Sequence, residues 1–144
     1  MRRVMRAREG VTAIETALLL PLLLIILFGI IEFSILFYDK AMITNASREG
    51  ARVGIAFCFD PATGRTHPPD SEIIAAVNQY CQNFLITFGS ASAPNTAIAR
   101  TGNGAGDSLT VRVTYTYDFL VLPNFLTSLG GAINLDATTV MRLE

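Results

Sequence analysis

This chain of 144 residues has only two cysteines and one histidine, and its positive and negative charges nearly balance. The two cysteines have neither CxxC spacing nor neighbouring histidines, which excludes a disulfide-scaffolded miniprotein and a zinc site. A net charge of −1 excludes a strongly basic nucleic-acid-binding protein. The single histidine, His67, lies in a turn beside Pro68, so no plausible pair of nucleophile and base is present. We therefore expect no enzyme activity, no metal or cofactor, no small-molecule substrate and no nucleic-acid partner.

Charge is absent altogether between Glu15 and Glu32, and this gap contains the dominant feature of the sequence. Twelve of the residues between 17 and 31 are Leu, Ile or Phe. Counted from Val11, the apolar segment has about 21 residues, or roughly 31 Å as a helix, which matches a bilayer core. Its apolar side chains supply about −6 kcal/mol of insertion free energy, against roughly +3 kcal/mol for one acid. The sequence predicts a membrane-spanning helix in contact with lipid.

Charge around this segment predicts its orientation. Four arginines precede it, and only one acid, Glu9, lies among them, whereas Glu32, Asp39 and Lys40 follow it. By the positive-inside rule, the N-terminus is cytoplasmic and the C-terminal part is extracytoplasmic, as in a single-pass protein of the inner membrane. Pro21 removes one helical hydrogen bond and should kink the helix.

The helix should continue beyond the membrane to about Ala56, because no proline interrupts the sequence there. Glu49 and Arg52 are spaced to form an ion pair on its surface. A stripe at three- and four-residue spacing predicts that the outer half packs against a domain. Its members are Phe33, Leu36, Phe37, Ile43, Ala46, Gly50 and Val53.

The remaining residues predict a small α+β domain. A turn-rich segment leads to a second helix, capped by Asp70 or Ser71 and ending near Gly89. Alternating apolar residues then predict strands at 96–100, 108–118 and 133–144, in an antiparallel sheet of about three to four strands. The outer domain is therefore a sheet on two helices, spanning 57–144 after a long helix at 11–56.

The two cysteines have two possible roles. A bond between Cys58 and Cys81 would close a 24-residue loop and stabilise the fold by roughly 3.4 kcal/mol in an oxidising compartment. Two free core thiols are the alternative. We expect the disulfide.

Several motifs at the N-terminus resemble the type IV pilin superfamily, specifically the TadE-like pseudopilins of tight-adherence (Flp) pili. The resemblance begins with REGVTAIE, in which a basic leader (1–10) ends at Gly10 and Glu15 is the fifth residue beyond it. It continues through the proline of LLLPLLL and the segment FGIIEF to NASREGAR. The family motif in that last segment comprises Arg48, Glu49, Gly50, Ala51 and Arg52.

The resemblance implies a processing and assembly role. A membrane-embedded prepilin peptidase would cut after Gly10 and leave Val11 as the new N-terminus. Glu15 would then pair with the freed amine of a neighbouring pilin-like subunit, because an unpaired acid is costly in an apolar setting. Thr16 stands where the major Flp pilins carry tyrosine, and those pilins are far shorter. The implied function is that of a pseudopilin or minor pilin in pilus assembly, with other assembly proteins as partners and possible incorporation into the fibre.

Two other interpretations of the N-terminus compete with this one. A secretory signal peptide is disfavoured because bulky residues, EFSILFY, follow Ile31 where a small-x-small cleavage site would be needed. An uncleaved signal anchor remains open, and would carry an extracytoplasmic domain that binds a ligand or a surface. Cleavage of the N-terminus and lateral assembly distinguish the pilin-like subunit from this uncleaved anchor.

Overall fold

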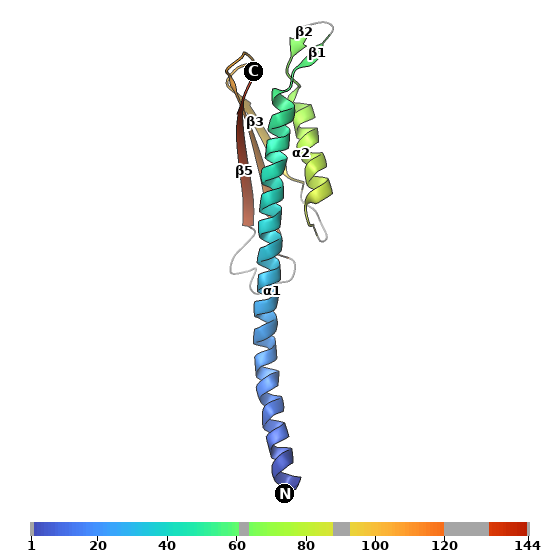
Figure 1. Ribbon diagram of the computed structural model, residues 1–144, viewed down its shortest axis with the longest axis vertical. Coiled ribbons are helices and arrows are strands. Elements are labelled where there is room, and N and C mark those ends of the chain that lie inside the picture. Colours follow the sequence, from blue (N-terminus) through green and yellow to red (C-terminus); the bar gives the residue numbers. More distant parts are fainter. Residues whose placement is uncertain (1, 61–63, 88–92, 120–132, 144) are drawn as a thin grey trace.

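A long helix and a small α+β domain on its C-terminal half make up the molecule (Figure 1). The computed structural model describes residues 2–60, 64–87, 93–119 and 133–143. The elements are α1 (Arg2–Ile55), β1 (Cys58–Asp60), β2 (Gly64–Thr66), α2 (Asp70–Phe84), β3 (Asn95–Arg100), β4 (Ser108–Tyr117) and β5 (Ile133–Arg142). The predicted α+β class, long first helix, second helix and antiparallel sheet are confirmed.

The main sheet has three antiparallel strands in the order β3-β4-β5. β4 and β5 pair along their whole length, from Ser108 opposite Arg142 to Tyr117 opposite Ile133. Alternate side chains of β4 are buried, which confirms the face predicted from the sequence: Leu109, Val111, Val113, Tyr115 and Tyr117. Burial on one face only fixes the register, because a slip of one residue would turn these side chains outward.

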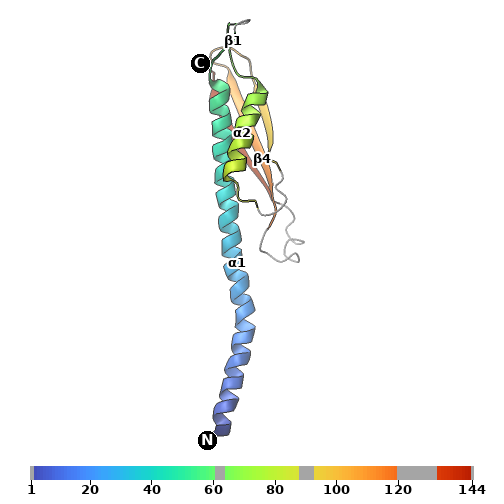
Figure 2. The same ribbon diagram turned by 90° about the vertical axis from the view of Figure 1, so that its right-hand side faces the viewer.

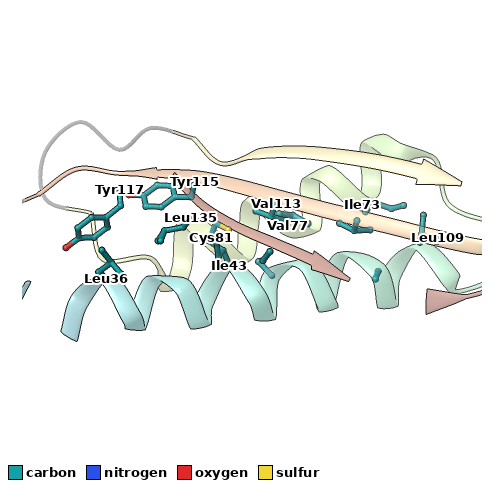
Figure 3. Packing of buried hydrophobic residues seen from close by; sticks show 14 of the residues in the cluster. Leu36, Ile43, Ile73, Val77, Cys81, Leu109, Val113, Tyr115, Tyr117 and Leu135 are labelled. Atoms are coloured by element: carbon teal, nitrogen blue, oxygen red, sulfur yellow. The ribbon is translucent and has the colours of Figure 1, made fainter. Parts of the chain in front are cut away.

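The core lies between this face and the two helices. Figure 2 shows α1 and α2 on the same side of the strands. In Figure 3 the side chains of Ile43, Val77 and Val113 meet from α1, α2 and β4, and each is 0% exposed. The outer half of α1 is thus part of the domain core, not a stalk beneath it.

The ends of the helices follow local chemistry. α1 ends at Ile55, one residue from the predicted end. α2 ends at Phe84, well before the predicted Gly89, because Leu85 adopts an extended conformation; Gly89 lies outside the described residues. Asp70 is the first residue of α2 and not its cap. Its Oδ1 instead lies 3.0 Å from Nη1 of Arg100, which joins α2 to β3.

The segment between the helices contains a hairpin that the sequence did not predict. β1 and β2 are only three residues long, and Gly64 has a φ of 81°, a left-handed conformation that favours glycine. His67, predicted to lie in a turn, is half-buried and stacks on Phe57 with ring centroids 4.5 Å apart. Turn-forming residues here produced a short hairpin and not an irregular loop.

The predicted apolar stripe of α1 is partly wrong. Phe33 and Phe37 are 53% and 67% exposed, and Val53 is half-buried. The buried stripe contains two acids and several small residues: Glu32, Leu36, Asp39, Ile43, Ala46, Ser47, Gly50, Ala51 and Gly54. At about 100° per residue, Phe33 and Phe37 lie on a different side of the helix from Ile43, whose face meets the sheet.

Candidate functional site

Residues 11–31 of α1 form an exposed apolar rod. Within the described residues α1 is the one helix long and apolar enough to cross a membrane. From Val11 to Ile31 every side chain except Gly29 is exposed. Gly10 and Val11 lie in continuous helix, and Glu15 is exposed a little over one turn later. The helix continues through Pro21, and its N-terminal half curves gently in Figure 2.

The motif at 48–52 divides between two faces of α1. On the outer face, Nε of Arg52 donates to Oε2 of Glu49 at 2.9 Å, which confirms the predicted ion pair. Hydrogen bonding to Arg52 lowers the pKa of Glu49. Both groups are solvent-accessible, so this pair contributes little to stability.

The inner face of the same motif is a close helix contact. Gly50 and Ala51 are buried. A Cβ placed on Gly50 would lie 2.5 Å from Cγ2 of Val77, a distance at which either the Val77 side chain or the helix backbone must shift. One turn later, a Cβ on Gly54 would lie 2.4 Å from Cδ2 of Leu109. The glycines allow α1 to approach α2 and β4 more closely than any other residue type would.

A buried carboxylate marks the point where the apolar segment meets the domain. Glu32, the first charged residue after the span, is 0% exposed. The hydroxyl of Tyr117, at the end of β4, donates to its Oε1 at 2.7 Å. Burial, and then the bond to Glu32, raise the pKa of the Tyr117 phenol. The hydroxyl therefore stays protonated and able to donate at neutral pH.

A second buried acid lies two turns further along α1. Asp39 is 0% exposed, and its Oδ1 accepts a hydrogen bond of 3.0 Å from the backbone N–H of Ile86. This bond ties the chain beyond α2 to α1. Among the described residues, no donor reaches its Oδ2. Burial raises the pKa of Asp39, and the Ile86 bond opposes that rise only in part.

The comparison with known proteins concerns α1. Residues 10–52 match the sequence model of the TadE-like protein family. Over this segment the chain is similar to TadE-like proteins. No curated protein and no solved structure matches the chain.

The matched segment covers both structural parts of α1. It begins at Gly10, includes Glu15 and Pro21, and ends at Arg52, so it contains the apolar rod and the helix contact at Gly50. α2 and the sheet lie outside it. The matched segment also contains most of the helix that, among the described residues, is long and apolar enough to cross a membrane.

Glu32 and Asp39 are the site residues that sequence reasoning missed. Both lie inside the TadE-like segment, and together with Leu36 they occupy positions i, i+4 and i+7 of one helix face. That spacing was readable, but acids beside a membrane span are ordinarily assigned to solvent. Their burial depends on Tyr117 and Ile86, which are far away in the sequence.

The predicted disulfide is absent, and both cysteines are free thiols. Cys58 is exposed in β1, beyond the end of α1, whereas Cys81 is buried in α2. Cys81 lies 11 residues along α2 from Asp70, or about 16 Å from the end of that helix nearest the hairpin. A disulfide needs Cα atoms within about 7 Å. Burial and the neighbouring Asp39 raise the pKa of Cys81 to about 11.

No metal site accompanies these groups: the described residues contain no cluster of three or more His, Cys, Asp or Glu side chains that could hold an ion.

Asp39 should make stability depend on pH. Because its pKa is raised in the folded chain, the folded state holds this proton more tightly than the unfolded state. The resulting stability is fully present below the ordinary carboxyl pKa of about 3.9, and is lost as pH rises through the raised value.

Asp39→Asn keeps an oxygen for Ile86 and removes the titration. We expect urea unfolding of the variant to show a smaller loss of stability across this pH range. Asp118→Asn, which removes an exposed carboxyl group directly after β4, is the control for loss of an acid as such. An unchanged pH profile in Asp39→Asn would contradict the assignment.

Proposed function

We propose that this chain is a pseudopilin or minor pilin that takes part in assembling tight-adherence pili. It is anchored in the inner membrane by residues 11–31, with the N-terminus cytoplasmic and the α+β domain extracytoplasmic. The observation that carries the proposal is the TadE-like match, which starts at Gly10 and runs through the apolar half of α1.

The proposed chemistry of the chain is that of a substrate and a structural subunit, not of an enzyme. Prepilin peptidase cuts after Gly10, and the new N-terminus is the amine of Val11. This bond lies at the border between the arginine-rich leader and the apolar rod, where a membrane-embedded peptidase can reach it. Other pilin-like subunits and pilus assembly proteins are the partners of the mature chain.

Glu15 has a physical reason to take part in assembly. It is an exposed acid on an otherwise apolar rod, and an unpaired carboxylate in hydrocarbon is costly. The amine created at Val11 is a complementary charge, and Glu15 lies four residues, or about 6 Å, further along the helix. Pairing Glu15 with the amine of a neighbouring subunit satisfies both charges and fixes the stagger between two helices.

The deciding experiment is N-terminal sequencing of the membrane-extracted protein from cells with and without active prepilin peptidase. We expect a mature chain beginning at Val11, and an uncut chain in peptidase-deficient cells. Gly10→Ala should block the cut, since the peptidase recognises glycine before the scissile bond. Gly29→Ala is the matched control in the same helix, because a Cβ there meets nothing within 4 Å, and it should be processed normally.

An intact N-terminus in peptidase-active cells would contradict the proposal. It would favour an uncleaved signal anchor whose outer domain binds a ligand or a surface.

A further inference from the structure

An exposed apolar stripe on α1 begins inside the membrane span and continues past Glu32, where the domain begins to cover the helix. Ile26, Ile30, Phe33 and Phe37 follow each other at spacings of four, three and four residues, so they share one side of α1. Their exposed fractions are 53%, 62%, 53% and 67%. The stripe is therefore uncovered, within the described residues, both inside and beyond the segment 11–31.

The opposite side of α1 at the same level is covered by the domain. Glu32 and Asp39 are completely buried there, bonded by Tyr117 and by the backbone of Ile86. At this level the domain therefore covers the acids of α1 and leaves its aromatics exposed. The next residue at this spacing is Lys40, which is half-buried and whose Nζ donates to the backbone oxygen of Asp136 on the domain.

The membrane span and the stripe together match a whole bilayer, not only its hydrocarbon core. From Val11 to Phe37 the helix is about 40 Å long, and a bilayer with its headgroup layers is about 40–45 Å thick. If the hydrocarbon ends near Ile31, Phe33 and Phe37 lie roughly 3 Å and 9 Å further out. Both then lie within the headgroup layer, where aromatic rings, chiefly those of Trp and Tyr, are enriched.

We propose that Phe33 and Phe37 contact the lipid headgroup layer and that the Tyr117 end of the domain rests directly on the membrane surface. The occupant of this face in the membrane-resident protein is lipid, because the stripe is continuous with the membrane span and the helix from Val11 to Phe37 matches the bilayer in length. The hydroxyl of Tyr117 keeps Glu32 hydrogen-bonded at the border, so the acid does not meet lipid. This inference rests on the membrane anchoring in the proposed function, but not on cleavage or pilus assembly.

The absence of tryptophan from the chain gives a direct test. Phe33→Trp and Phe37→Trp each introduce a single fluorophore into the full-length protein, which is reconstituted into phosphatidylcholine vesicles with or without brominated acyl chains. Leu23→Trp, in the middle of the span, and Phe57→Trp, an exposed site beyond the end of α1, are the two references. Bromine quenches tryptophan at short range, and disorder of the acyl chains carries some bromine up to the headgroup layer, so the loss of emission falls with the distance of each ring from the hydrocarbon.

We expect strong quenching at Leu23→Trp, clear quenching at Phe33→Trp, weaker quenching at Phe37→Trp, and none at Phe57→Trp. Emission from Phe33→Trp and Phe37→Trp as unquenched as that from Phe57→Trp would overturn the proposal, while quenching at Leu23→Trp would show that the span itself is inserted. A blue-shifted but unquenched emission would assign the face to another protein chain, which also overturns it. No quenching at Leu23→Trp would refute the membrane span and with it this inference.

Discussion

Gly50→Leu is expected to abolish stable packing of the outer domain on α1. A single methyl group at this position would already lie 2.5 Å from Val77 and 3.4 Å from both Ile73 and Val111. Overpacking of a close-packed core costs about 1–3 kcal/mol, and a leucine, with three more carbons than that methyl, should exceed this range. Small domains have only about 5–15 kcal/mol of total stability. Urea unfolding of the detergent-solubilised full chain, followed by near-ultraviolet circular dichroism, measures the loss.

Two further variants define this prediction. Gly50→Ala should destabilise by about 1–3 kcal/mol, less than leucine, because only the first methyl must be accommodated. Gly29→Leu changes a glycine of the same helix where a Cβ meets nothing within 4 Å, and should leave the outer domain at wild-type stability. Equal stability of Gly50→Leu and Gly29→Leu would show that the helix contact is not as close as the structure has it.

Tyr117→Phe should destabilise the outer domain by about 1.5–3 kcal/mol, the range for hydrogen bonds to charged groups. The variant keeps the ring and removes only the hydroxyl that donates to Glu32 at 2.7 Å. Because Glu32 is completely buried, water does not replace the lost donor. The same urea titration measures this change.

A double-mutant cycle tests whether the energy belongs to this bond. In a Glu32→Gln background the acceptor is no longer charged, so Tyr117→Phe should cost less than in the wild-type chain. Tyr115→Phe is the matched control, because Tyr115 is buried on the same face of β4 but its hydroxyl makes no hydrogen bond among the described residues. Additive effects of the Tyr117 and Glu32 changes would contradict the proposed coupling.

The parts of the fold set by local pattern were predictable from the sequence. β4 alternates apolar and polar residues over its whole length, and its buried face was predicted residue by residue. The apolar segment before Glu32 and the end of α1 near Ile55 followed from composition and from the absence of proline. These features depend on neighbours in the sequence, which periodicity records.

The parts that depend on distant contacts were not predictable. Phe33 and Phe37 were assigned to the core on hydrophobicity, although in a membrane protein an apolar side chain has a second favourable environment in lipid. Glu32 was left unassigned because its donor, Tyr117, is 85 residues away. The disulfide was inferred from loop closure and an oxidising compartment, and only the structure shows that Cys58 and Cys81 remain free thiols.

Because α1 runs without interruption from the apolar segment into the domain core, the molecule has no flexible joint between the two. The rotation of the domain about the helix axis, relative to the anchor, is therefore determined by the number of residues between them. Inserting or deleting one residue near Ile30, before Glu32, would rotate the whole domain by about 100° relative to the anchor. A reorientation of the domain in the plane of the membrane must either turn the anchor with it or melt a section of the helix.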